Sequence, residues 1–146
     1  MRAIKFKGFS KELDKWLYGC LIQGNNKFYI SKQGYLGFYA CFGIYVNILG
    51  FEEHKDISEV EPKSIGQYTG VKDKYSIEIY EGDILSLKTN YDDIIVGFVE
   101  FKRGAFCLNS EDFGYDGEFI SNLDAEFEII GNIFKNPELL KSKDDK

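Results

Sequence analysis

The sequence predicts an all-β protein built from many short strands. Phe, Tyr and Trp make up 16% of the chain, and aromatic side chains suit a pleated, half-buried surface. Fifteen glycines and only two prolines separate the apolar runs, and most of these runs are too short for anything but a strand. No stretch has the long, capped period of an amphipathic helix. These observations indicate a β sandwich or a small barrel.

The N-terminal residues predict an antiparallel meander. Residues Ala3–Lys7 alternate in polarity, so that Ile4 and Phe6 share one face, and the polar run Gly8–Lys15 predicts a turn. A second strand is expected over Trp16–Ile22. The Gly-Asn-Asn triplet that follows is a strong turn signal and leads to a third strand over Lys27–Ser31.

A less regular region follows the meander. Gly34–Phe51 predicts two more strands, although its glycine spacing leaves their register open. The acidic run Glu52–Glu61 predicts a loop or linker, with a boundary near Pro62. We therefore expect an N-terminal β subdomain over residues 1–62, a β barrel over residues 63–136, and a short helix with a charged tail over residues 137–146.

The second half restarts with short strands. A strand is expected over Ile65–Gly70, and Val71–Ser76 predicts a turn. Two further strands, Ile77–Tyr80 and Asp83–Lys88, flank Glu81-Gly82, which marks another turn.

The clearest hairpin joins Ile94–Phe101 to Ala105–Leu108, because Gly104 in the intervening turn can supply a positive φ. A last strand is expected over Glu126–Phe134. Asn136 then resembles an N-cap, with proline at the first helical position, so a short helix is expected over Pro137–Lys141.

Size and charge exclude several classes of protein. With 146 residues the chain is long enough to fold without disulfides or a metal. A net charge of −6 argues against a duplex DNA binder that relies on basic residues. The sequence shows neither a signal peptide nor a membrane-spanning run. The odd set Cys20, Cys41 and Cys107 fits buried, reduced thiols, and hence a cytoplasmic protein.

The sequence supports no catalytic, cofactor-binding or metal-binding residue. His54 is the only histidine and lies in a polar run, which indicates a solvated loop rather than a catalytic site. Zinc sites with several His or paired Cys are excluded by count. The segment Asp112–Gly117 resembles part of a calcium loop, but Gly114 and Leu123 stand where ligands should be, so an acidic turn is favoured. No phosphate-binding glycine motif is present. We therefore expect a protein that is not an enzyme.

Two segments combine aromatic and basic residues, as single-strand-binding barrels do. One is Phe101–Phe106, with Lys102 and Arg103 at its centre, and the other is Tyr68–Tyr75. The simpler interpretation is core aromatics at alternate strand positions, with the charges in turns.

Several ordered motifs resemble the YopX family of phage and prophage proteins. They are Ile4–Lys7, Trp16–Gly19, Ile65–Lys74, Glu78–Leu85, Gly97–Phe101, Gly104–Phe106 and Ile130–Leu140. The resemblance covers almost the whole chain and is weakest over Gly24–Ser58. One departure is Lys74-Tyr75-Ser76-Ile77, where the family usually has Lys-Asn-Gly. A two-residue turn is therefore not expected there.

The resemblance implies an irregular N-terminal β part and a C-terminal SH3-like barrel. It also implies a phage or prophage gene expressed in a bacterial host, and it carries over no catalytic residue. Positive φ is expected at Gly70 and Gly82, a turn cap at Asp83, and core positions at Tyr68, Tyr80 and Phe98. We expect a non-enzymatic interaction or assembly module that forms a homo-oligomer, with Gly34–Phe51 too apolar for a free loop. The alternative is a nucleic-acid-binding regulator that uses the Lys102-Arg103 hairpin.

Overall fold

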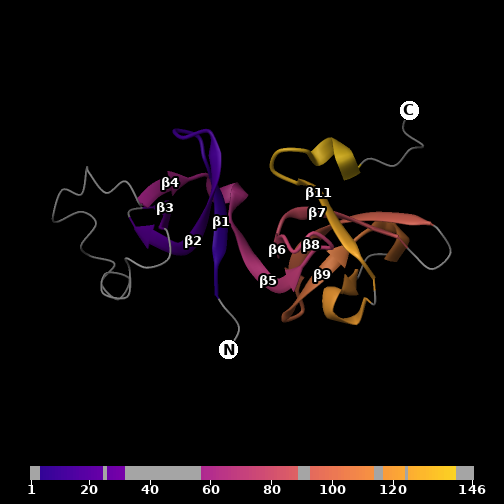
Figure 1. The fold of residues 1–146 in the computed structure, drawn as a ribbon. Helices are drawn as coiled ribbons and strands as arrows, with labels where there is room; N and C mark the ends of the chain where they lie inside the picture. The colour runs from indigo at the N-terminus through magenta and orange to yellow at the C-terminus, as the bar shows by residue number, and fades with distance from the viewer. Residues whose placement is uncertain are drawn as a thin grey trace. The chain divides into compact units, whose positions relative to one another are not determined.

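The computed structural model describes residues 4–24, 26–31, 57–88, 93–113, 117–123 and 125–140. Within these ranges the regular structure consists of β strands and short 3₁₀ helices, with no α-helix. None of these helices is long and apolar enough to span a membrane. The predicted all-β class is confirmed (Figure 1).

The chain divides into two compact units, residues 1–67 and 68–146. The domain limits expected from the sequence, residues 1–62, 63–136 and 137–146, stay a prediction. Unit 1 contains β1 (Phe6–Ser10), β2 (Lys15–Gly24), β3 (Lys27–Ser31), β4 (Ile57–Val60) and the 3₁₀ helix η1 (Pro62–Ser64). Strand β5 (Gly66–Lys72) crosses the division. Unit 2 continues with β6 (Glu78–Tyr80), β7 (Asp83–Lys88), β8 (Ile94–Lys102), β9 (Ala105–Asn109), η2 (Glu111–Phe113), β10 (Glu118–Phe119), η3 (Ile120–Asn122), β11 (Phe127–Asn132) and η4 (Pro137–Leu140).

The strands form two antiparallel sheets. A six-stranded sheet has the order β4-β3-β2-β1-β5-β6, and a five-stranded sheet has the order β10-β9-β8-β7-β11. The N-terminal meander β1-β2-β3 is confirmed by its register. No closed barrel is present in the part of the chain that the structure covers.

Strand β1 begins later than expected. It starts at Phe6 and includes the Gly8-Phe9-Ser10 segment that was predicted as a turn. Phe9 is buried and packs edge-on against Trp16, with ring centroids 5.6 Å apart. Gly8 faces Val60, whose side chain would lie 2.8 Å from a Cβ at that position. The strand therefore follows tertiary packing rather than the local alternation of charge.

The predicted loop over Glu52–Glu61 is wrong at its C-terminal end. Residues 57–60 form β4, which pairs with β3 along its whole length. Val60 is buried, and the Glu59 carboxylate accepts a hydrogen bond of 2.7 Å from the Lys27 ammonium. That hydrogen bond raises the pKa of Lys27 above its ordinary value. The end of the acidic run thus forms a strand because its backbone pairs with β3 and its Val60 side chain is buried, whereas the exposed ion pair between Lys27 and Glu59 adds little.

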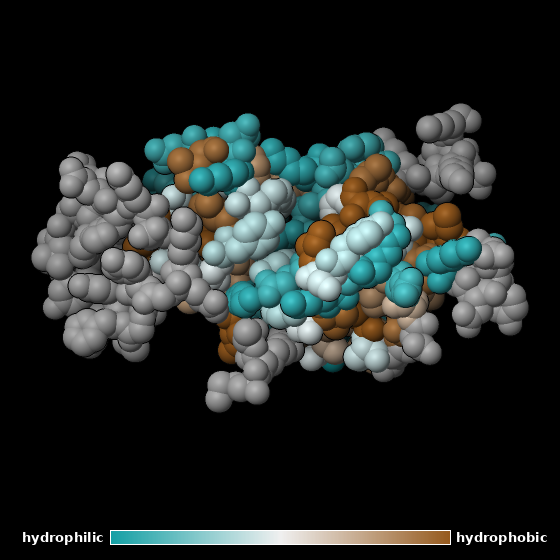
Figure 2. Space-filling model, in the orientation of Figure 1, coloured by the Kyte–Doolittle hydropathy of each residue, from teal (hydrophilic) through white to brown (hydrophobic). Residues whose placement is uncertain are grey.

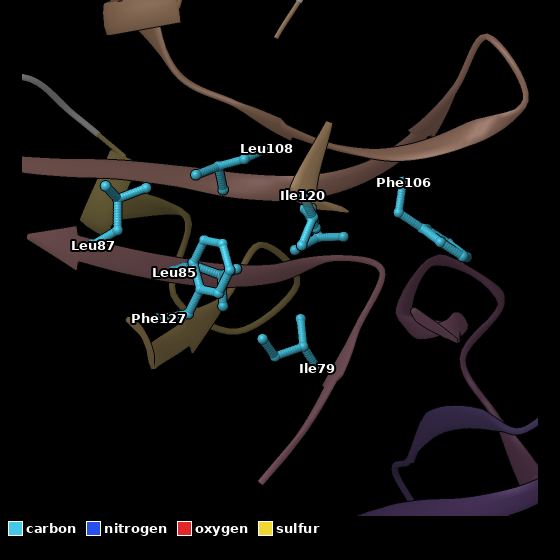
Figure 3. Packing of buried hydrophobic residues seen from close by; sticks show 8 residues of the cluster. Ile79, Leu85, Leu87, Phe106, Leu108, Ile120 and Phe127 are labelled. Atoms are coloured by element: carbon cyan, nitrogen blue, oxygen red, sulfur yellow. The ribbon is translucent and has the colours of Figure 1, made fainter. Parts of the chain in front are cut away.

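Unit 2 is organised around one hydrophobic cluster (Figure 3). The cluster joins side chains from β6, β7, β8, β9, η3 and β11: Ile79, Leu85, Leu87, Val99, Phe106, Leu108, Ile120 and Phe127. The predicted strands around Ile77–Tyr80, Asp83–Lys88, Ile94–Phe101 and Ala105–Leu108 are confirmed within one or two residues. The two-residue strand β10 and the turns η2 and η3 were not predicted.

The C-terminal strand departs from a simple alternation. A register irregularity between Ile129 and Gly131 leaves Ile130 on the exposed side. The short helix expected after β11 is a 3₁₀ helix over Pro137–Leu140, and the last residue expected in it, Lys141, lies outside the described residues. Leu139 Cδ1 would lie 2.7 Å from a Cβ on residue 131, so Gly131 permits this close packing.

Candidate functional site

The β8–β9 hairpin carries the basic and aromatic residues that the sequence singled out. Lys102 pairs with Ala105, so the turn holds only Arg103 and Gly104, with φ of 54° and 81°. Two successive positive φ values are the hallmark of a type I′ turn. The predicted role of Gly104 is confirmed. Arg103 was not expected in a left-handed conformation, which Asn would have signalled more clearly.

Aromatic rings surround this turn. Phe101 is 54% exposed, and its ring meets the buried ring of Phe106 edge-on at 5.1 Å. The Arg103 guanidinium lies 5.5 Å from the ring centroid of Phe119, which β10 contributes. The structure thus unites the predicted residues and adds Phe119, which had no signal of its own in the sequence.

Carboxylates share this surface with the basic residues. The Lys102 ammonium lies 3.6 Å from Glu100 Oε1, which also accepts a hydrogen bond of 2.9 Å from the Asn109 amide. Glu81 Oε1 accepts a hydrogen bond of 3.3 Å from the Phe101 backbone N–H. The end of the β8–β9 hairpin is therefore an aromatic surface with both basic and acidic side chains, rather than a row of basic side chains that could bind phosphates.

The polar residues of the longest motif are used by the fold itself. Asp83 is 2% exposed, and its Oδ2 accepts a hydrogen bond of 2.8 Å from the Tyr80 backbone N–H. Its Oδ1 accepts one of 3.2 Å from the side-chain amide of Asn132. The predicted turn cap at Asp83 is confirmed, and so are the positive φ values of Gly70 and Gly82, at 92° and 84°.

Asn132 extends this network to the C-terminal segment. Its Oδ1 accepts a hydrogen bond of 2.9 Å from the Phe134 N–H, and its own N–H donates to Asn136 Oδ1 at 3.4 Å. The Asn136 side chain therefore holds β11, while its backbone carbonyl accepts the Leu139 N–H that closes η4. A side-chain N-cap at Asn136 was expected, and the structure gives that oxygen a different partner. Of the predicted core aromatics, Tyr68 and Tyr80 are buried and Phe98 is half-buried.

Residues 73–77 form the loop between β5 and β6. The connection is therefore longer than a two-residue turn, as the departure from Lys-Asn-Gly led us to expect. Asp73 is buried, and its Oδ1 accepts hydrogen bonds from the backbone N–H groups of Tyr75 and Ile77, at 2.8 and 2.9 Å. Ser76 takes a left-handed φ of 66°. The side chains of Tyr75 and Ile77 are 63% and 55% exposed.

Several sequence candidates lie outside the described residues. These are His54, Cys41 and the segment Gly34–Phe51. Of the calcium-like segment, residues 114–116 are also outside, and Asp112 Oδ2 accepts a hydrogen bond of 3.2 Å from the Ser110 hydroxyl. Cys20 and Cys107 are free thiols, and Cys107 is fully buried. Across the parts of the chain that are described, no group of His, Cys, Asp or Glu is placed to hold a metal ion.

The comparison with family models matches the YopX protein family over residues 5–141. The chain belongs to the YopX family. The match includes every strand and the whole Asp83–Asn132 network, so the predicted resemblance is confirmed.

One solved structure resembles the YopX chain over 97% of its length and over 100% of the other chain. It is the crystal structure of protein EF1440 from Enterococcus faecalis, with a TM-score of 0.52 and 22% sequence identity. At this identity the likeness concerns the fold alone. No similar protein was found among the curated proteins.

Proposed function

We propose that this YopX chain is a non-enzymatic interaction or assembly module, encoded by a phage or prophage, that acts as a homo-oligomer in the bacterial cytoplasm. The observation that carries the proposal is that the polar residues of the YopX motif form hydrogen bonds within the fold. Asp83 is buried, and its oxygens accept hydrogen bonds from the Tyr80 N–H and the Asn132 amide. The motif therefore builds a scaffold, and contacts with a partner fall to exposed side chains instead.

The scaffold fits the proposed SH3-like character of the second half. Supporting it are five short antiparallel strands around one hydrophobic cluster, with 3₁₀ turns between them. Small β folds of this kind present loops and strand ends on a rigid frame. Figure 2 shows hydrophobic residues at the surface of both units beside hydrophilic ones. The large apolar side chains that are more than half exposed include Ile94, Tyr75 and Phe101.

The first expected result is an oligomer in solution. Size-exclusion chromatography with light scattering at micromolar concentration should give a mass at least twice that of the 16.8 kDa chain. The sample is purified at low salt without nuclease, and absorbance is recorded at two wavelengths. A monomer under these conditions contradicts the proposed assembly.

The aromatic hairpin tip supports one alternative, a nucleic-acid-binding regulator. Phe101 is exposed beside Lys102 and Arg103, as in stacking platforms for single strands. Replacing Arg103 by Asn removes the guanidinium and keeps a residue that tolerates the left-handed turn. Under this alternative, Arg103→Asn weakens binding of a labelled oligonucleotide and lowers the salt slope by about one.

The Asn variant is preferable to Ala at this position because Ala would add backbone strain to the loss of charge. Unchanged thermal stability then shows that the turn is intact. If the wild-type protein binds no oligonucleotide at low salt, the alternative is excluded. If it elutes with nuclease-sensitive absorbance, the alternative replaces the assembly proposal.

A further inference from the structure

We infer that strand β5 couples the folding of the two compact units, so that a change in the stability of one unit changes the stability of the other. The chain divides between Gln67 and Tyr68, inside β5, and the strand runs without interruption from Gly66 to Lys72. Boundaries between independent domains usually fall in exposed linkers that few contacts cross. The coupling does not depend on what the chain binds, so it goes beyond the proposed function.

The beginning of β5 is held by unit 1. Gly66 and Gln67 pair with β1. Just before them, Ser64 is 4% exposed, and its hydroxyl accepts a hydrogen bond of 2.7 Å from the Phe9 N–H. The same hydroxyl donates a hydrogen bond of 2.7 Å to the Glu61 carbonyl. Buried hydrogen bonds therefore fix this end of the strand to β1.

The remainder of β5 is held by unit 2. Tyr68 pairs with Tyr80 on β6, and the centroids of their rings lie 5.5 Å apart. Thr69 is 7% exposed, and its hydroxyl donates a hydrogen bond of 2.9 Å to the Ile79 carbonyl. Ile79 is fully buried and belongs to the hydrophobic cluster of unit 2. This part of β5 is thus bonded to the core of unit 2.

The two attachments are adjacent in the chain. Gln67 pairs with β1, and the next residue, Tyr68, pairs with β6. Gly66, Tyr68 and Thr69 are buried, and Gln67 is half-buried. If unit 2 opened alone, Tyr68 and Thr69 would lose their buried partners immediately beside residues that stay paired with β1. Since local unfolding proceeds in contiguous cooperative segments, the opening of one unit should also loosen the β5 pairing of the other.

The single tryptophan makes this coupling measurable. Trp16 lies on β2 and packs against Phe9, so its fluorescence reports the unfolding of unit 1. Asp83 lies in unit 2, where Asp83→Ala removes the acceptor of two hydrogen bonds. We expect the urea midpoint of Trp16 fluorescence to coincide with that of far-UV circular dichroism, and Asp83→Ala to lower both midpoints together. A Trp16 midpoint that Asp83→Ala leaves unchanged overturns the coupling.

A milder variant keeps the test decisive if Asp83→Ala prevents unit 2 from folding. Ile120→Val shortens a side chain that is 3% exposed in the hydrophobic cluster of unit 2. It should lower the Trp16 midpoint by a smaller amount, and a shift confined to the dichroism signal contradicts the coupling. All variants are compared at one protein concentration, because self-association would shift the midpoints by mass action.

An insertion tests whether β5 itself carries the coupling. The residues Gly-Ser-Gly-Ser, placed between Gln67 and Tyr68, delete nothing from either unit and add a flexible spacer. We expect this variant to unfold in two separate transitions, with a Trp16 midpoint that no longer responds to Asp83→Ala. If the Trp16 midpoint still follows Asp83→Ala after the insertion, the coupling does not pass through β5 and the inference is overturned.

The same insertion elsewhere in unit 2 is the matched control. Asp93 and Ile94 are both exposed at the start of β8, so a spacer between them should be tolerated. This control should leave the fluorescence and dichroism transitions coincident. Two separate transitions in the control as well would show that any insertion separates the signals, against a specific role of β5.

Discussion

Replacing Asp83 by Ala is expected to destabilise unit 2 by about 3 kcal/mol or more. The substitution leaves the Tyr80 N–H and the Asn132 amide without their acceptor in a buried site, where Asp83 is 2% exposed. A hydrogen bond to a charged group contributes about 1.5–3 kcal/mol, and a buried donor left without a partner adds its desolvation cost. Urea unfolding, monitored by far-UV circular dichroism, measures the change in the free energy of unfolding.

Asp93→Ala is the matched control, because Asp93 is exposed immediately before β8 and the same change there should stay within about 0.5 kcal/mol. Combining Asp83→Ala with Asn132→Ala completes a double-mutant cycle. The two effects should sum to clearly more than the double variant loses, because both residues serve one network. Simple additivity would show that the two side chains act independently, against the geometry of the hydrogen bond between them.

Replacing Gly97 by Ala is expected to cost about 3 kcal/mol, near the upper end of the usual penalty for overpacking. A Cβ at this position would lie 2.5 Å from the Asn109 carbonyl oxygen and 3.0 Å from Ser110 Cβ. The obstacle is the backbone of the neighbouring strand β9, which cannot rotate away as a side chain could. The same unfolding measurement should therefore show a large shift in midpoint.

Two glycines serve as comparisons for Gly97. At Gly24 a Cβ would meet nothing within 4 Å and φ is not positive, so Gly24→Ala should be nearly neutral. At Gly104 the space is also open, but φ is +81°, so Gly104→Ala should cost only the strain of a left-handed residue, about 1–2 kcal/mol. If Gly97→Ala lowers the free energy of unfolding by no more than Gly104→Ala does, the close approach of β8 to β9 is not what restricts this position.

The Asp83 network has a consequence for the YopX motif. Gly82, Asp83 and Asn132 are tied to one another, since the Gly82 carbonyl accepts the Ile133 N–H and a Cβ on residue 82 would lie 3.3 Å from the Asn132 amide nitrogen. The residues that make the family recognisable are thus the residues that close unit 2. Differences in what individual members bind are then expected in exposed loops, such as residues 73–77 of this chain.

Local pattern was sufficient where an element is defined by its own neighbours. The strand Lys27–Ser31 and the strand Asp83–Lys88 appear with the predicted bounds, because each lies between turn signals and carries a compact apolar run. The hairpin at Gly104 was predictable for the same reason, since a tight turn needs a positive φ that few residues supply. The all-β class follows from such segments, and the YopX resemblance follows from their order.

Contacts between distant residues decided the rest. Strand β4 forms from an acidic run because its backbone pairs with β3 and Val60 is buried. Lys27 and Glu59, which pair across these two strands, are 32 positions apart, so no local pattern encodes the pairing. Asp83 and Asn132 are 49 positions apart, so their hydrogen bond could not be predicted from local pattern either. The same holds for Phe119, which lies near Arg103 but belongs to a strand of only two residues. The sequence by itself determined the class, the turns and the family, because these depend on backbone preference and alternation. The tertiary structure alone decided which polar groups are buried together and which loop presents Tyr75 and Ile77, because those depend on where the chain returns to meet itself.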